Sequence, residues 1–86
     1  MQVMTKTNLK ALREELKEVP EKSLKRVAQE DLAREAGLRV TTYRNIELGR
    51  ATTYKKANAI LEAVNRLRKD RDLAPVTLED LCINIA

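Results

Sequence analysis

The chain has 86 residues, 43% of them hydrophobic, contains no His, Phe or Trp, and carries a formal net charge of +4. This length allows one domain with a small aliphatic core, and the absence of histidine beside a single cysteine argues against an enzyme, a metal site or a bound cofactor. No stretch approaches the roughly 18 apolar residues of a membrane span and no secretory leader opens the chain, so we expect a cytoplasmic protein without a membrane partner.

The first third of the sequence is predicted to hold a tail, one helix and a connector. Residues 1–7 show no periodicity and are expected to form a loose tail. Asn8 can cap the helix that follows, whose apolar residues are spaced three or four apart. These are Leu9, Leu12, Leu16 and Val19. Pro20 stops the helix, because the residue before a proline resists the helical conformation, and the polar residues 20–26 are expected to form an extended connector.

Two short helices joined by a glycine turn are predicted next. The first spans residues 29–36 and ends at Gly37, since glycine takes the left-handed conformation without a side-chain clash. The second runs over about residues 40–48 and ends at Gly49. The side chains expected to face the core are Leu32, Ala33, Ala36, Leu38, Tyr43 and Ile46.

The longest predicted helix begins after Thr52 or Thr53, either of which can cap it. Its core-facing residues are Ala57, Ile60, Leu61, Val64 and Leu67. We expect this helix to fray within the charged residues 68–72.

The last predicted helix is short. A turn at residues 73–75 leads to Thr77, which can cap it with Asp80 as the partner in a capping box. Cys82 is expected to be a small buried apolar side chain. The sequence therefore predicts one all-α domain over residues 1–86, with five helices and no strands.

The net positive charge of the chain comes from the segment between residues 39 and 56. This segment holds five basic residues and one acidic residue, Glu47, whereas the rest of the chain holds 12 of each and sums to zero. The basic residues are Arg39, Arg44, Arg50, Lys55 and Lys56. Such a segment is either a solvated face that happens to be basic or a footprint for a polyanion, because Lys and Arg over phosphates release condensed counterions.

Residues 29–49 have the residue types that two tightly crossing helices require. Ala33 is small where the backbones approach, Gly37 tolerates positive φ in the turn, and aliphatic residues flank it on both sides. This is the spacing of a helix-turn-helix, whose second helix can lie in the major groove of DNA.

The same residues carry a resemblance to the Cro/C1-type (Xre-like) helix-turn-helix family of phage repressors and bacterial regulators. The matching positions are Gln29, Asp31, Leu32, Ala33, Ala36, Gly37, Leu38, Ile46, Glu47, Leu48 and Gly49. Residues 77–81 look like the fifth helix of that fold, so the resemblance covers about residues 8–82. It implies a five-helix lambda-repressor-like domain and a transcription regulator that binds double-stranded DNA, usually as a dimer on a near-palindromic operator.

The solvent-facing side of the second short helix is the candidate surface for reading DNA bases. Its members are Val40, Thr41, Arg44 and Asn45. Arg44 can pair bidentately with guanine and Asn45 with adenine, while Val40 and the Thr41 methyl group can contact a thymine methyl group. The alternative is that these side chains form an ordinary exposed helix surface.

A second set of residues is expected to contact the DNA backbone. These residues are Gln29, Arg39, Arg50, Thr53, Lys55 and Lys56. The resemblance implies that Gln29 binds a phosphate and buttresses the reading helix, and that Arg50 contacts the sugar-phosphate backbone. It also implies a structural role for Glu47. We expect Tyr43 and Tyr54 in the core or at its rim.

Two helix starts lack the side-chain caps common in that family. Ala28 stands where a Ser or Thr commonly caps the Gln-led helix, and this should cost about 1 kcal/mol. Arg39 replaces a capping hydroxyl before the reading helix.

Surplus aliphatic residues near the C-terminus are expected to form a homodimer interface. These are Leu78, Leu81, Ile83 and Ile85. An alternative function is a protein-interaction module, such as an antitoxin or adaptor, which would bind a protein partner through the connector or the C-terminal tail.

Overall fold

A computed structural model describes residues 7–18 and 28–86, and at residues 17 and 18 it describes the backbone alone. The described chain forms five helices: α1 (Leu9–Glu18), α2 (Gln29–Ala36), α3 (Val40–Glu47), α4 (Tyr54–Asp70) and α5 (Leu78–Leu81). Within these residues there is no strand, and one isolated parallel bridge joins Thr52 to Ile85. The prediction of an all-α fold is confirmed. The connector at 20–26 and most of the predicted tail lie outside the described residues.

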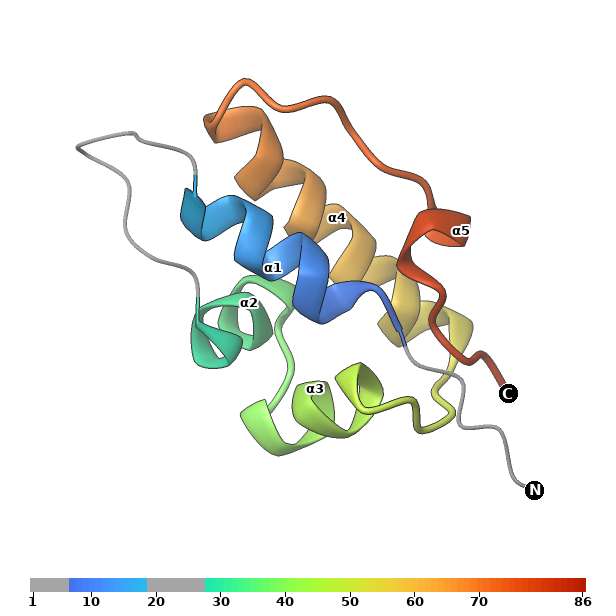
Figure 1. The fold of residues 1–86 in the computed structure, drawn as a ribbon. Coiled ribbons are helices and arrows are strands. Elements are labelled where there is room, and N and C mark those ends of the chain that lie inside the picture. The colour runs from blue at the N-terminus through green and yellow to red at the C-terminus, as the bar shows by residue number, and fades with distance from the viewer. Residues whose placement is uncertain (1–6, 19–27) are drawn as a thin grey trace.

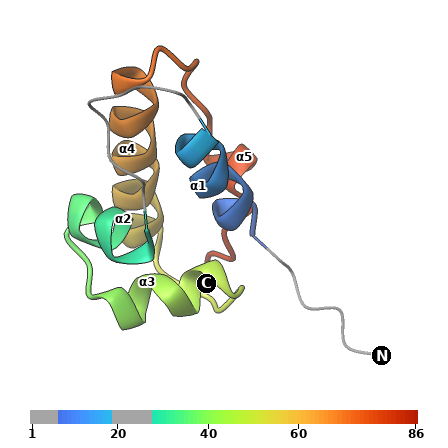
Figure 2. The same ribbon diagram turned by 60° about the vertical axis from the view of Figure 1, so that its left-hand side comes forward.

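The helices pack around α4, the longest of them (Figure 1). α1 lies beside α4, α2 packs against both α4 and α3, and α5 contacts α4. Turned by 60°, the molecule shows α3 at one end, below α2 and across the end of α4 (Figure 2). One long side of α3 is therefore not covered by another helix in the described chain.

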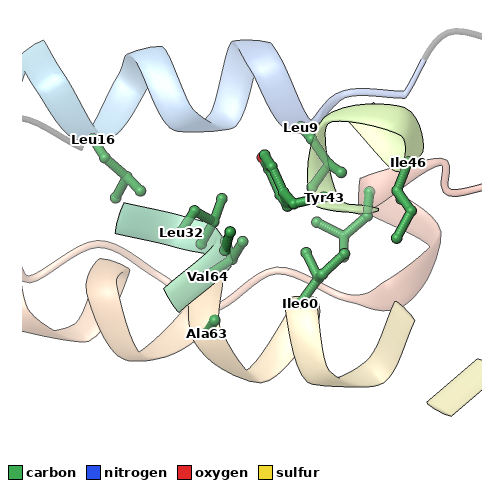
Figure 3. Packing of buried hydrophobic residues seen from close by; sticks show 10 residues of the cluster. Leu9, Leu16, Leu32, Tyr43, Ile46, Ile60, Ala63 and Val64 are labelled. Atoms are coloured by element: carbon green, nitrogen blue, oxygen red, sulfur yellow. The ribbon is translucent and has the colours of Figure 1, made fainter. Parts of the chain in front are cut away.

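The core lies where α1, α2, α3 and α4 converge. Its fully buried larger side chains include Leu9, Leu16, Leu32, Tyr43, Ile60, Val64 and Leu81. Figure 3 shows buried side chains of α1, α2, α3 and α4 meeting in one cluster. Burying one such side chain contributes about 1.5–3 kcal/mol, so this cluster supplies the main driving force for folding.

α4 ends at Asp70, within the charged residues 68–72 where the sequence predicts its end, but this end is held by side chains and does not fray. Arg68 and Arg71 are buried. Arg71 Nε donates to the Leu16 carbonyl at 3.2 Å, and Arg68 donates to the Ala74 carbonyl and pairs with Glu15. Leu16 lies in the last turn of α1, whose carbonyls have no partner within the helix. The two arginines therefore fasten the end of α4 to α1.

Of the two threonines proposed to cap α4, Thr53 is the cap, and the predicted Thr77 cap of α5 is confirmed. Thr53 Oγ1 accepts from Lys56 N at 3.2 Å at the start of α4. Thr77 Oγ1 accepts from Asp80 N at 3.3 Å, and Asp80 Oδ2 accepts from Thr77 N at 2.8 Å, which completes a capping box. These bonds satisfy backbone N–H groups that a helix start would otherwise leave without partners.

The structure corrects two details expected of the C-terminal segment, while the dimer itself stays a prediction. Leu81 is fully buried in the core of its own chain and does not face a partner, and Leu78 and Ile83 are half-buried against that core. Cys82 is exposed and has a φ of 54°, because α5 ends there in the left-handed conformation. Of the four residues assigned to a dimer contact, Ile85 alone is exposed, at 39%.

The beginning of the described chain is tied to its end. Asn8 N donates to the Leu81 carbonyl at 3.0 Å, and the Asn8 side-chain amide donates to the Asp80 carbonyl at 2.9 Å. Thr7, which belongs to the predicted loose tail, donates from Oγ1 to the Glu47 carbonyl at 2.8 Å. Thr7, two residues before α1, is therefore already bound to the folded domain.

No described helix is both long enough and apolar enough to cross a membrane.

Candidate nucleic-acid interface

The turn between α2 and α3 closes as the glycine pattern predicts. Gly37 has a φ of 72°, and Leu38 N donates back to the Ala33 carbonyl at 2.8 Å. A Cβ built at Gly37 would meet no atom within 4 Å, so the position needs glycine for its backbone conformation rather than for space. Ala33 is buried, as a close approach of the helices requires.

The start of α2 compensates in part for the missing cap. Ala28 has no side-chain oxygen to accept from the first turn, but its own N–H donates to Asp31 Oδ2 at 2.9 Å. α3 likewise begins after Arg39 without a side-chain cap. Both helices nevertheless start where the sequence predicts.

The four residues proposed to read bases share one side of α3 but differ in exposure. Tyr43 and Ile46 are buried, which turns positions 41 and 44 outward, and Thr41 and Arg44 are exposed. Asn45 is half-buried. Val40 is also half-buried and packs against the core, so part of its surface is not available to a ligand.

Positive side chains flank this face at both ends of α3. Arg39 precedes α3, and Arg50 with Lys55 and Lys56 follow it in the loop and first turn of α4. All four side chains are exposed, as is Arg44 between them. The one acidic residue of this segment, Glu47, is turned inward, with a side chain only 7% exposed. The exposed charge of residues 39–56 is therefore entirely positive.

Glu47 is neutralised by a residue from α1. Its carboxylate accepts from Arg13 Nη2 at 3.2 Å and from Arg13 Nε at 3.3 Å, in a bidentate pair, and from Gln29 Nε2 at 2.9 Å. Burial opposes ionisation of the carboxyl, but these hydrogen bonds and the Arg13 charge outweigh it and hold the pKa of Glu47 below its ordinary value. The structural role predicted for Glu47 is confirmed, and Arg13 is a partner that sequence reasoning missed.

Tyr43 lies beside this pair. Its hydroxyl is buried near Glu47 and Arg13 but makes no hydrogen bond of good geometry within the described chain. Burial, together with the nearby carboxylate, raises the pKa of Tyr43 far above its ordinary value, so the phenol stays neutral. The expectation that Tyr43 is a core residue is confirmed, whereas Tyr54 is 62% exposed.

Gln29 connects the buried pair to the exposed face. Its side-chain oxygen Oε1 accepts from Arg44 Nε at 3.3 Å, while its Nε2 donates to Glu47. The structure thus brings together a residue expected at a phosphate and one expected at a base, although they lie on different helices.

A hollow of about 350 Å³ lies between the end of α3 and the start of α4. Three of the residues that line it, Arg50, Thr53 and Lys56, are proposed phosphate contacts. Asn45, a proposed base contact, also lines it. Thr42 also lines it and was not among the predicted site residues. Its position three residues before Asn45, on the same side of α3, is the signal that could have indicated it.

The described residues contain no group of three or more His, Cys, Asp or Glu side chains that could hold a metal ion. The side chains on the uncovered side of α3 offer hydroxyl, amide and cationic groups to a ligand.

Comparison with known proteins gives no relative for this chain. No family model matches it, and neither the curated proteins nor the solved structures give a significant match.

Proposed function

We propose that the chain is a lambda-repressor-like helix-turn-helix domain that binds double-stranded DNA in a sequence-specific manner and regulates transcription. The observation that carries this proposal is the side of α3 that no other described helix covers (Figure 2). Exposed Thr41 and Arg44 belong to α3, which exposed Arg39 precedes and exposed Arg50, Lys55 and Lys56 follow. An α-helix fits the major groove of B-DNA, where each base pair presents a distinct pattern of donors and acceptors.

The side chains on this face suit base recognition. The Arg44 guanidinium can donate two parallel hydrogen bonds to guanine, the Asn45 amide can pair with adenine, and the Thr41 methyl group can meet a thymine methyl group. Half-buried Val40 has a smaller part in this proposal than its exposed neighbour Thr41.

The cations at the two ends of α3 suit phosphates on either side of the groove. Arg39 would contact one backbone, while Arg50, Lys55 and Lys56 would contact the other. The first turn of α4 adds backbone N–H groups and the positive end of a 17-residue helix, which favour an anion at that point. The Thr53 hydroxyl already caps the helix and can still donate to a phosphate oxygen.

We also propose that the domain acts as a homodimer, through a contact different from the one expected from the sequence. The exposed large apolar residues of the described chain are Leu48, Tyr54 and Ile85. The Thr52–Ile85 bridge and a bond from the Asn84 side chain to the Gly49 carbonyl bring their chain segments together. Leu48 directly follows α3 and Tyr54 begins α4, so both are close in sequence to the residues proposed to read bases, Thr41, Arg44 and Asn45, which we call the reading face. A second copy bound through Leu48, Tyr54 and Ile85 could place its α3 about 34 Å away in the next major groove.

The experiment that tests DNA reading is selection from a random duplex pool with the wild-type chain, Arg44→Ala and Lys69→Ala. Lys69 is an exposed cation on α4 and controls for the loss of one charge. We expect a two-fold symmetric motif from the wild type and from Lys69→Ala, and a changed motif from Arg44→Ala.

Two outcomes would count against the proposal. A folded wild-type protein that enriches no sequence would favour a protein-interaction module instead, as in an antitoxin or adaptor. Binding that depends on salt but has no sequence preference would reduce the function to nonspecific attraction to a polyanion.

A further inference from the structure

The hollow between the end of α3 and the start of α4 has the size and charge of a site for a small ligand. Its volume of about 350 Å³ lies within the range of small-molecule pockets, roughly 300–1,000 Å³. The side chains that line it include the exposed cations Arg50 and Lys56, and none of them is acidic. The hollow is therefore suited to an anion that need not be part of a DNA backbone.

The most buried polar residue that lines the hollow is Thr52, which is 8% exposed. Its backbone N–H donates to the Asn84 carbonyl and its carbonyl accepts from Ala86 N, both at 2.9 Å. Its hydroxyl has no hydrogen-bond partner among the described residues. Within these residues, Tyr43 carries the one unpartnered side-chain polar atom that is sealed from solvent, so the Thr52 hydroxyl still reaches open space. This hydroxyl is therefore a donor available to a ligand in the hollow.

Further donors line the same hollow as Thr52. Thr42 and Asn45 belong to α3, and Thr53 and Lys56 lie at the start of α4. The Thr53 oxygen accepts from Lys56 N, which leaves the hydroxyl hydrogen free to donate. The start of α4 is also the positive end of the dipole of a 17-residue helix. Hydroxyl, amide and cationic groups gathered in this way favour an oxyanion.

The set of donors fits a phosphate monoester better than a phosphodiester. A monoester has three terminal oxygens and a charge of about −1.5 to −2 at pH 7, whereas a phosphate of the DNA backbone has two free oxygens and a single charge. The two cations of the hollow and the hydroxyls of Thr42, Thr52 and Thr53 match the monoester. A backbone phosphate is also joined to a sugar on both sides. It can meet exposed Arg50 and Lys56, but its substituents hinder it from reaching buried Thr52.

We propose that this hollow binds the terminal phosphate of a small phosphate monoester, with the Thr52 hydroxyl as a ligand and Arg50 and Lys56 as the opposite charges. Sugar phosphates and nucleoside monophosphates belong to this class. The site itself does not depend on the proposed function. Its consequence for DNA does rest on that function: Arg50, Thr53 and Lys56 cannot serve both ligands at once, so the monoester should release DNA.

The test is titration of the ¹⁵N-labelled chain with ribose 5-phosphate, followed through the NMR signals of the backbone amides of residues 50–56. Dimethyl phosphate, a diester, and sodium chloride are titrated for comparison at one constant ionic strength, because salt screens exposed charges. We expect saturable shifts with ribose 5-phosphate, weaker binding of dimethyl phosphate, and no saturation with chloride.

Two variants separate the hydroxyl from general attraction to charge. Thr52→Val keeps the shape of the side chain but removes the hydroxyl, and it should weaken binding of ribose 5-phosphate about tenfold, since a hydrogen bond to a charged group is lost. Thr52→Ser keeps the hydroxyl and should bind as the wild type does. If circular dichroism shows that Thr52→Val is unfolded, Lys56→Ala at an exposed position replaces it, with exposed Lys69→Ala as its control.

Three results would overturn the site: no saturable shift with ribose 5-phosphate, equal binding of dimethyl phosphate, or equal binding by the wild type and the folded test variant. Equal binding of the diester would leave the hollow as a contact for the DNA backbone alone. Release of the selected duplex by ribose 5-phosphate tests the competition, and a duplex that stays bound to the occupied protein would disprove it. If the wild type selects no motif, the DNA-reading function fails, while the titration still decides the monoester site.

Discussion

At the scale of single residues, Glu47 has the least replaceable side chain of the proposed interface. It lies at the end of α3 and accepts from Arg13 of α1 and from Gln29 of α2, so that one carboxylate joins three helices. Removing one member of such a pair leaves the other charge poorly solvated, which costs more than the pair itself contributes.

Glu47→Gln should lower the free energy of unfolding at pH 7 by about 2 kcal/mol, less than for a fully buried pair because water still reaches this one. The folded-state pKa of Glu47 lies below the ordinary value of 4.5. The stabilisation is therefore present above that value and is lost as the pH falls through the folded pKa.

Urea unfolding of the wild type and Glu47→Gln at a series of pH values measures this contribution. The difference between them should shrink in acid. Glu62→Gln, at an exposed position of α4, should show no such difference at any pH. A gap of constant size between wild type and Glu47→Gln would contradict the proposed ionised pair.

At the scale of helices, the turn between α2 and α3 fixes how the reading face is presented. The turn depends on the positive φ of Gly37, and the space around its Cβ position is open. The cost of a substitution there is therefore conformational and separate from any clash.

Gly37→Ala should lower the free energy of unfolding by about 1–2 kcal/mol, the cost of the left-handed conformation for a residue with a Cβ. Gly37→Asn should cost less, since Asn adopts this conformation more readily. Chemical denaturation followed by circular dichroism tests both variants. An equal loss in the two, or none in either, would show that the turn does not need a left-handed residue.

The helices and their caps could be predicted from local sequence, because their causes lie within a few residues of one another. The apolar spacing of α3 placed Tyr43 and Ile46 in the core, and the threonines at 53 and 77 gave the starts of α4 and α5. Gly37 indicated the turn for the same reason.

Contacts between distant segments could not be predicted in this way. A run of charged residues normally suggests a solvated end, and the sequence pattern does not show that the Leu16 carbonyl at the end of α1 accepts a hydrogen bond from buried Arg71. The bond between Gln29 and Arg44 joins different helices and has no local pattern. In the four-residue α5, one position separates buried Leu81 from exposed Cys82, and so short a helix has no periodicity to distinguish them.

At the scale of the whole molecule, charge and apolar surface gather on neighbouring regions. The exposed cations of residues 39–56 lie on α3 and in the segments before and after it, and exposed Leu48 and Tyr54 belong to the same part of the chain. The Thr52–Ile85 bridge brings the segment of Ile85 to it. Exposed apolar groups of this kind are a common mark of an interaction site. Their place next to the reading face favours a second copy of the chain, which would double the number of phosphates contacted.

Tyr54→Glu should weaken self-association, because it places a charge in the proposed contact. Sedimentation velocity without DNA should show the wild type shifting to dimer as its concentration rises and the variant remaining monomeric. Ala11→Glu adds the same charge at an exposed position of α1, and this variant should associate as the wild type does. A wild type that stays monomeric at high micromolar concentration would argue against the dimer.

The bonds between Asn8 and the residues around Leu81 also bear on how the domain is made. α1 leaves the ribosome first, yet its N-terminal hydrogen-bond partners lie more than 70 residues later in the chain. Contacts of such long range form late in folding, since they require closure of a long loop. The segment from α2 to α4 can assemble earlier, through contacts between sequence neighbours. Arg13 reaches Glu47 only when α1 docks, so the ion pair that joins α1 to the end of α3 should form in one of the later steps of folding.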